Sequence, residues 1–257
     1  MAIEKNGRQI VTLDEWFREA PPKGRAKHWV DGRSAKEAAR AWLEAGAELP
    51  PEVASALNSN VHLGAVSEWQ LEPEARLRFD GYAGEVRNSD LAGVAHTTSG
   101  PVLLAVEAKA DETFGETLQA ATGSAVANLV GNRASQGLPR IHQLVLAVLG
   151  TREEGRREAL KLRYQLLTAT AGALCEAERR KCRAAVLLVH EFRSAQTSDK
   201  KLKANATDLE AFVAWVSQGQ VASVRDGEIV GPFMLPGVPL FSDALPLYLG
   251  KAVRDIR

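Results

Sequence analysis

The 257-residue sequence has little cysteine, and its two cysteines cannot easily pair. Cys175 and Cys182 lie seven positions apart in a segment expected to be helical, which separates them by about 10 Å. That separation is too large for a disulfide bond. Because unpaired cysteines are typical of a reducing compartment, we expect a cytoplasmic protein.

Several common motifs are absent as well. The sequence contains no CxxC and no HExxH, which removes the usual signals of a zinc site. It contains no GxGxxG and no phosphate loop ending in GK[ST]. No apolar run approaches the roughly 18 residues of a transmembrane helix, and no charged-then-apolar leader opens the chain. We therefore expect a protein with no membrane association.

The chain has no excess charge of either sign. Lys plus Arg number 32 and Asp plus Glu number 32, so the formal net charge is zero. This balance excludes a strongly basic coat but allows a local basic patch. Hydrophobic residues make up 45% and charged residues 25%, which is typical of a globular protein.

Sequence periodicity predicts an α/β fold with a mixed central β-sheet flanked by helices. Strands are expected over residues 75–80, 86–95, 102–108, 141–149 and 184–190. Helices are expected over residues 51–57, 114–130, 156–181 and 207–218. The polar stretch 194–206 is expected to be a surface loop.

Two further segments flank the expected core, which spans residues 49–220. Residues 1–48 are expected to form a helical N-terminal extension packed on the core, with capping-box patterns at 12–15 and 34–37. Residues 221–257 are expected to form a C-terminal hairpin, with its turn at 226–227, followed by an extended tail.

Charged side chains end the third expected strand. Because successive side chains of a strand alternate, Glu107 and Lys109 share one face. The other face, formed by Val102, Leu104 and Val106, is expected to pack on the core. Asp90 lies 17 positions before Glu107. A hairpin turning near residues 99–100 would bring these two carboxylates side by side.

Two adjacent carboxylates repel each other unless a cation lies between them. A hard divalent ion with oxygen ligands, such as Mg²⁺, suits this position and can activate water against a phosphodiester. Lys109 would then orient or deprotonate that water, or stabilise charge on the phosphate. The pattern is short, however, and Asp199-Lys200-Lys201 also satisfies it. A plain salt bridge between Glu107 and Lys109 therefore remains an equal alternative.

Asn88-Ser89-Asp90 followed by Val106-Glu107-Ala108-Lys109 resembles the PD-(D/E)XK nuclease superfamily, which has the restriction-endonuclease-like fold. The helix–strand–strand–strand–helix–strand order resembles its core. The strings at 106–115, 163–167 and 186–190 look similar to an uncharacterised bacterial branch of it. The resemblance covers roughly residues 28–217. Ser89 stands where the superfamily name has proline.

This resemblance implies a Mg²⁺ (or Mn²⁺) site. Asp90, Glu107 and the backbone carbonyl of Ala108 would be its ligands, and Lys109 would be the catalytic lysine. Members often add a glutamate from the first core helix, for which Glu68 is the candidate and Glu85 the alternative.

Gln165 follows Tyr164 on a helix expected to pack against the sheet, where it would either hydrogen-bond in the site or cap a buried polar group. Lys200, Lys201 and Lys203 would contact nucleic acid, although charge runs are more often solvated surfaces.

Three hypotheses follow. The first is a Mg²⁺-dependent nuclease acting on DNA, in restriction or phage defence, with a homodimer for double-strand cleavage. The second is a catalytically inactive binding or scaffold protein on the same fold, which the neutral net charge favours. The third is an ordinary salt-bridged α/β domain whose pocket binds a small ligand. The expected stability cost of removing Asp90 or Glu107 is small, because like-charge repulsion is relieved.

Overall fold

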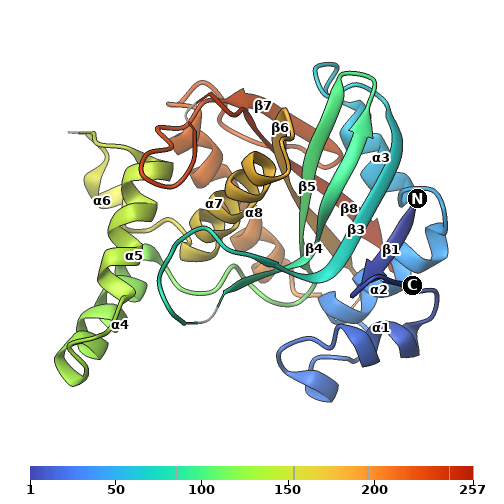
Figure 1. The fold of residues 1–257 in the computed structure, drawn as a ribbon, viewed down its shortest axis with the longest axis horizontal. Coiled ribbons are helices and arrows are strands. Elements are labelled where there is room, and N and C mark those ends of the chain that lie inside the picture. Colours follow the sequence, from blue (N-terminus) through green and yellow to red (C-terminus); the bar gives the residue numbers. More distant parts are fainter. Residues whose placement is uncertain (85, 153, 196, 243, 257) are drawn as a thin grey trace.

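The protein, seen here as a computed structural model, is built on a mixed β-sheet with helices on both faces (Figure 1). The structure describes residues 1–84, 86–152, 154–195, 197–242 and 244–256. This arrangement confirms the expected α/β class and the flanked mixed sheet. Among the described helices, none combines the length and apolarity that crossing a bilayer requires.

Eight strands form the sheet, in the order β2-β1-β3-β4-β5-β6-β8-β7. Strands β3, β4 and β5 are antiparallel neighbours, whereas β6 is parallel to both β5 and β8. The strands are β1 (Ala2–Lys5), β2 (Arg8–Gln9), β3 (Val66–Leu77), β4 (Arg87–Thr97), β5 (Gly100–Lys109), β6 (Ala184–Arg193), β7 (Glu228–Phe233) and β8 (Leu247–Asp255).

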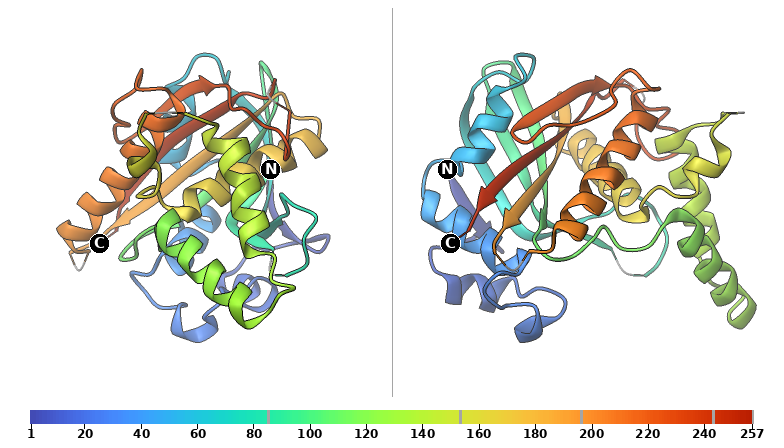
Figure 2. Two further views of the ribbon diagram at one scale, coloured as in Figure 1. Left: turned by 90° about the vertical axis from the view of Figure 1, so that its left-hand side faces the viewer. Right: turned by 180° about the vertical axis from the view of Figure 1, so that it is seen from behind.

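The helices divide between the two faces of the sheet (Figure 2). On one side α2 and α3 lie against the sheet and α1 packs on α2. On the other side lie α7 and α8, with α5 packed on α7 and α4 on α5. The helices are α1 (Leu13–Glu19), the 3₁₀ turn η1 (Arg25–Lys27), α2 (Ser34–Ala45), α3 (Pro51–Asn58), α4 (Leu118–Gly131), α5 (Gly137–Leu144), the π-helical segment η2 (Val145–Leu149), α6 (Arg156–Ala159), α7 (Tyr164–Arg179) and α8 (Asp199–Val216).

Strand β5 lies between two separate hydrophobic cores, one on each face of the sheet. Leu104 and Val106 pack beneath α2 and α3, while Leu103 and Ala105 face α7. The expected packing of Val102, Leu104 and Val106 on a core is confirmed, and the opposite face of the strand is buried as well. Glu107 and Lys109 continue the second face, so they too lie beneath helices and are buried.

Both flanking segments contribute strands to the sheet. β1 pairs in parallel with β3, so residues 1–48 are not only helical. β8 lies between β6 and β7, which places the C-terminal segment inside the sheet. β7 and β8 pair antiparallel as a hairpin would, but residues 226–227 precede β7 rather than joining the two strands. The predicted position of that turn was wrong.

The predicted strand at 141–149 was also wrong, because this segment is helical in α5 and η2. Ile141, Leu144 and Val148 pack into the same core as α7. A short apolar run fits a buried helix as well as a buried strand, and periodicity alone does not separate the two.

The predicted helix 156–181 is interrupted. Leu160 and Leu162 lie in a connecting segment whose carbonyl oxygens accept hydrogen bonds from the backbone N–H groups of Gln119 (3.0 Å) and Leu118 (2.8 Å). These donors belong to the first turn of α4, which has no intrahelical acceptor for them. The segment turns instead of continuing one long helix, and its carbonyl oxygens satisfy that helix end.

The first half of α8 was predicted as a loop. The helix begins at Asp199, whose negative charge is favourable at the positive end of the helix dipole. Its second half is anchored in the core by the buried side chains of Leu209, Phe212 and Val213. At the N-terminus, the capping box of Thr12 and Glu15 is confirmed. The second predicted box is not formed.

Candidate functional site

The site lies where β4 separates from β5. Their pairing ends at Leu91 and Val106, and beyond this point two side chains of β4 satisfy the backbone of β5. The hydroxyl of Ser89 donates to the carbonyl oxygen of Val106 (3.0 Å). Oδ2 of Asp90 accepts from the backbone N–H of Ala108 (2.7 Å). The expected proximity of Asp90 to Glu107-Ala108-Lys109 is therefore present.

Ser89 has a structural role that proline could not fill. Its hydroxyl lies within hydrogen-bond distance of the carbonyl oxygens of both Val106 and Leu91 (2.9 Å). Proline has no such donor. Ser89 therefore helps to hold β4 against β5 beside Asp90.

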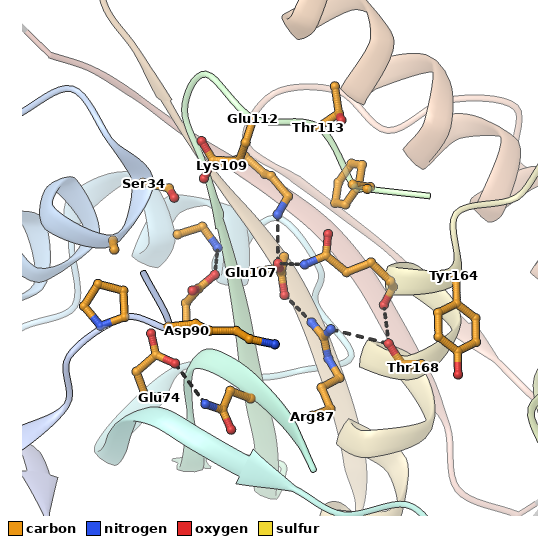
Figure 3. A pocket seen from close by; sticks show the side chains of 18 of the residues that line it. Ser34, Glu74, Arg87, Asp90, Glu107, Lys109, Glu112, Thr113, Tyr164 and Thr168 are labelled. Carbon is orange, nitrogen blue, oxygen red and sulfur yellow. Dashed lines mark hydrogen bonds and ion pairs between the residues drawn. The ribbon is translucent and has the colours of Figure 1, made fainter. Parts of the chain in front are cut away.

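Three donors surround the carboxylate of Glu107 (Figure 3). Nζ of Lys109 donates to Oε1 (2.8 Å), and the side-chain amide of Gln165 donates to the same oxygen. The guanidinium of Arg87 donates to Oε2. The predicted salt bridge between Glu107 and Lys109 is thus part of a larger buried network.

The first turn of α7 forms one wall of this network. Gln165 and Thr168 are three positions apart, so they lie on one side of the helix. The hydroxyl of Thr168 donates to the backbone carbonyl of Gln165 (3.0 Å) and lies 3.4 Å from Nη1 of Arg87. The side chain of Gln165 hydrogen-bonds to Glu107, which is both a predicted site residue and a buried polar group, so both roles left open for Gln165 are met by this one contact.

An acidic residue from outside the predicted set, Glu74 on β3, also lines the pocket. Trp69 and Leu71 pack on the α2 side of the sheet, whereas Ala75 and Leu77 pack on the α7 side. The alternation of side chains along β3 therefore shifts at Glu74, so that odd-numbered residues face one core before it and the other core after it. Glu74 has a left-handed backbone conformation (φ 47°).

This irregular backbone is held by Lys5 of β1. Its ammonium donates to the carbonyl oxygens of Pro73 (2.9 Å) and Glu74 (3.0 Å) and to the carboxylate of Glu72 (2.6 Å). Glu74 in turn accepts a hydrogen bond from the side-chain amide of Asn88 (3.1 Å). The N-terminal strand thereby helps to position an acidic side chain at the site.

The pKa values of the two central carboxylates shift in opposite directions. Burial disfavours the charge of Glu107, but Lys109 and Arg87 outweigh it and lower its pKa. Burial raises the pKa of Asp90 well above its ordinary value, and the negative charges of Glu107 and Glu74 add to this effect. Nearby positive charges therefore offset the burial of ionised Glu107, whereas the burial of ionised Asp90 is not offset.

Lys109 is held in its charged form. Burial opposes its charge, but the carboxylates of Glu107 and Asp90 raise its pKa above the ordinary value. Its Nζ also lies 5.1 Å from the centre of the Phe114 ring, which is a favourable cation–π position. The ammonium is thus a fixed positive charge at the bottom of the site.

A pocket of about 700 Å³ opens above these groups. The segment before α2 and the start of α2 form one side, including Lys23, Arg33 and Ser34. Tyr164 and Thr168 of α7 lie on the opposite side, with Asp90 and Glu107 between the two walls (Figure 3).

Of the two accessory glutamates, Glu68 is described, and it is not brought together with Asp90. Glu68 is exposed and pairs across the sheet with His96, six residues along β4 from Asp90. At about 3.3 Å per residue this is a distance of roughly 20 Å, so Glu68 was wrong as a candidate. Glu85 lies outside the described residues.

The three candidate lysines are placed in the first turns of α8. Lys200 and Lys203 are exposed, while Nζ of Lys201 lies 3.9 Å from the carboxylate of Asp111. Asp111 also pairs with Arg33 (3.2 Å), which contributes to the pocket wall. Lys201 therefore lies near the pocket, on a helix rather than on the expected loop.

The carboxylate oxygens of the site are the kind of ligand that a hard cation prefers, but they are not arranged around a common point. Asp90, Glu107 and Glu74 are oxygen donors. Burial, and then the charges of Glu107 and Glu74, raise the pKa of Asp90, and a bound cation would lower it. Among the described residues, no three acidic, histidine or cysteine side chains are grouped closely enough to hold a metal as they stand. Arg87 now neutralises the carboxylate of Glu107 that a metal would share.

Sequence reasoning missed Arg87, Glu74 and Thr168. Arg87 and Leu91 are four positions apart on β4, so strict alternation would place their side chains on the same face of the sheet. Leu91 packs on the α2 side, however, whereas Arg87 reaches Glu107 on the other side. A simple alternation rule therefore assigns Arg87 to the wrong face. Thr168 had a usable signal, since it lies one turn after Gln165.

The chain belongs to the DUF6946 family, a domain of unknown function, which it matches over residues 9–252. No curated protein and no solved structure matches the chain significantly.

Proposed function

We propose that this chain is a divergent PD-(D/E)XK nuclease that hydrolyses phosphodiester bonds, in DNA, with Mg²⁺ or Mn²⁺. The restriction-endonuclease-like core would comprise α3, the antiparallel strands β3, β4 and β5, then α7 and the parallel strand β6, in keeping with the resemblance. The observation that carries the proposal is the hydrogen bond from Ala108 N–H to Asp90, which joins the two motif segments at a pocket.

Asp90, Glu107 and the carbonyl oxygen of Ala108 would hold the ion, with Glu74 as a further acidic neighbour. The bound ion would polarise the phosphate and acidify a water molecule. Before this, the guanidinium of Arg87 must leave Glu107, because one carboxylate oxygen cannot be fully shared by both cations.

The chain's own residues supply the remaining functions. The ammonium of Lys109 stabilises negative charge on the scissile phosphate. Gln165 orients the carboxylate of Glu107 from α7, and the backbone N–H of Ala108 orients Asp90. Lys201, with Lys200 and Lys203 beside it, would face the nucleic acid as it leaves the pocket.

The proposed partners and location follow from this activity. Nucleic acid is the substrate, and the reducing cytoplasm is the proposed compartment for two free cysteines. Restriction or phage defence is the proposed context. A double-strand cut by a chain with one such site would require a homodimer.

A specific observation favours a second candidate, a catalytically inactive binding or scaffold protein. Both oxygens of Glu107 are already held by Arg87, Lys109 and Gln165. If this network never opens, the same residues stabilise the fold without binding a metal.

Incubation of single-stranded, supercoiled and linear DNA with Mg²⁺ or Mn²⁺ separates these candidates. Cleavage that is abolished by Glu107→Gln and by Lys109→Ala supports the nuclease. Metal-dependent thermal stabilisation without cleavage of any DNA favours the scaffold protein. If neither cleavage nor metal binding occurs, the metal-dependent proposal is wrong and a salt-bridged domain with a small-ligand pocket remains.

A further inference from the structure

The groups that would perform the chemistry lie at the bottom of the pocket rather than on a surface. Glu107 is 4% exposed and Lys109 is 3% exposed. A scissile phosphate must therefore enter the pocket to reach the ammonium of Lys109. This depth restricts the shape of any substrate.

The pocket has walls on two opposite sides. Lys23, Arg33 and Ser34 come from the N-terminal segment, most of which lies before or at the edge of the resemblance to known nucleases. Tyr164 and Thr168 stand across from them on α7 (Figure 3). A substrate must pass between these walls, because both include residues that line the same cavity as Asp90 and Glu107.

The size of the pocket suits a thin substrate. Its volume of about 700 Å³ lies within the range of cavities that enclose small molecules, about 300–1,000 Å³. A duplex has two backbones held on either side of stacked base pairs, and its major groove alone is about 12 Å wide. A duplex could touch the rim, but a single strand could enter.

The chemistry of the walls also suits a single strand. Arg33 presents a partly exposed guanidinium at the rim, beside the first turn of α2. Cationic groups and helix N-termini both favour phosphates. On the other wall, the partly buried ring of Tyr164 offers an aromatic surface of the kind on which unpaired bases stack.

We infer that the site acts on single-stranded nucleic acid or on frayed and overhanging ends, and that continuous duplex is excluded. This inference rests on the proposed nuclease function and names its substrate class. The walls formed by residues 22–35 and by the start of α7 admit one strand, which places its phosphate beside Asp90, Glu107 and Lys109.

Three DNA substrates of one sequence test the inference in Mn²⁺: a single strand, a duplex with a single-stranded overhang, and a relaxed, covalently closed duplex circle. The first two are expected to be cut, and the closed circle is expected to resist by at least about tenfold. Cutting of the closed circle at the same rate as the single strand would overturn the inference and leave the nuclease proposal standing.

Binding measurements with the Glu107→Gln variant separate the remaining outcomes. Single strands should bind more tightly than blunt duplex, and adding Arg33→Ala should weaken that binding by about tenfold. Arg18→Ala is the matched control, because Arg18 is exposed on α1 and pairs with its neighbour Glu19. Equal binding of both DNA forms would contradict the inference. If no DNA form is bound or cut, the nuclease proposal itself fails.

Discussion

The guanidinium of Arg87 donates a hydrogen bond to the carboxylate of Glu107, so the proposed metal ligand is neutralised by a side chain of the same protein. Both side chains are largely buried, with 11% and 5% of their surfaces exposed. The contact links the start of β4 to the end of β5. The proposed metal binding would therefore compete with this ion pair for one carboxylate.

This competition predicts that Arg87→Gln strengthens metal binding. Removing the guanidinium leaves Glu107 with Lys109 as its remaining cationic partner, and the lost competition should tighten Mn²⁺ binding by about tenfold, or ~1.4 kcal/mol. Calorimetric titration of the variant and the wild type measures this change. Arg76→Gln is the control, because Arg76 is exposed on β3. Weaker or unchanged Mn²⁺ binding in Arg87→Gln would show that the two cations do not compete.

The structure predicts that Glu107→Ala is strongly destabilising. This reverses the expectation from like-charge repulsion, because the variant would leave the cations Arg87 and Lys109 buried without their partner. Breaking a buried pair in this way costs about 3–5 kcal/mol of unfolding free energy. Urea denaturation measures the loss, and Glu74→Ala is the comparison variant with a smaller expected effect. A loss below that of Glu74→Ala would mean that the network contributes little to stability.

Asp90→Asn is predicted to stabilise the folded protein at neutral pH. Because burial and the charges of Glu107 and Glu74 raise the pKa of Asp90 in the folded state, ionisation of Asp90 disfavours folding. That penalty is absent near the unfolded pKa of about 3.9 and grows as pH rises toward the folded pKa. Asparagine can still accept the hydrogen bond from Ala108.

Thermal unfolding of Asp90→Asn and wild type between pH 4 and neutrality tests this prediction. The difference in melting temperature should be small at the acidic end and should favour the variant as pH rises. A variant that is less stable than the wild type at pH 7 would show that the charge of Asp90 is compensated in the folded state.

His190 is predicted to make stability fall in mild acid. The ring is fully buried between Trp42 and Phe192, with Nε2 2.9 Å from the carboxylate of Glu52. Burial lowers its pKa, although Glu52 opposes the shift. Because the folded pKa is depressed, the stability contribution is complete above the unfolded pKa of about 6.5 and is lost as pH falls below it.

The slope of unfolding free energy against pH between about 6.5 and 5 measures this effect. His190→Gln should flatten that slope even though it lowers stability overall, whereas His62→Gln, at an exposed position, should leave the slope unchanged. An unchanged slope in His190→Gln would assign the acid sensitivity to other groups.

Much of the central sheet could be predicted from the sequence, because β4, β5 and β6 are marked by alternation or by apolar runs with clear ends. The same signals placed Asp90 beside Glu107, since a hairpin fixes the register of two antiparallel strands. The segment 141–149 was wrongly assigned to a strand, because a short apolar run fits a buried helix as well as a buried strand. The helical start of α8 was hidden by its polar composition.

The site itself was only partly predictable. Asp90, Glu107 and Lys109 follow simple strand geometry, and Gln165 was correctly associated with the helix beside them. Glu74 and Arg87 depend on the exchange of faces at the left-handed residue Glu74, which Lys5 stabilises from the far end of the sequence. No local pattern reveals a backbone irregularity that a distant side chain holds in place.

The central claim is that Asp90 and Glu107 share a divalent cation. Calorimetric titration of the wild-type protein with Mn²⁺, alongside the Asp90→Asn variant, tests it most directly. The claim predicts one saturable Mn²⁺ site in the wild type, and affinity reduced by at least about a hundredfold in Asp90→Asn, whose fold should remain intact. Equal Mn²⁺ binding by the two proteins, or no binding by the wild type, would contradict it.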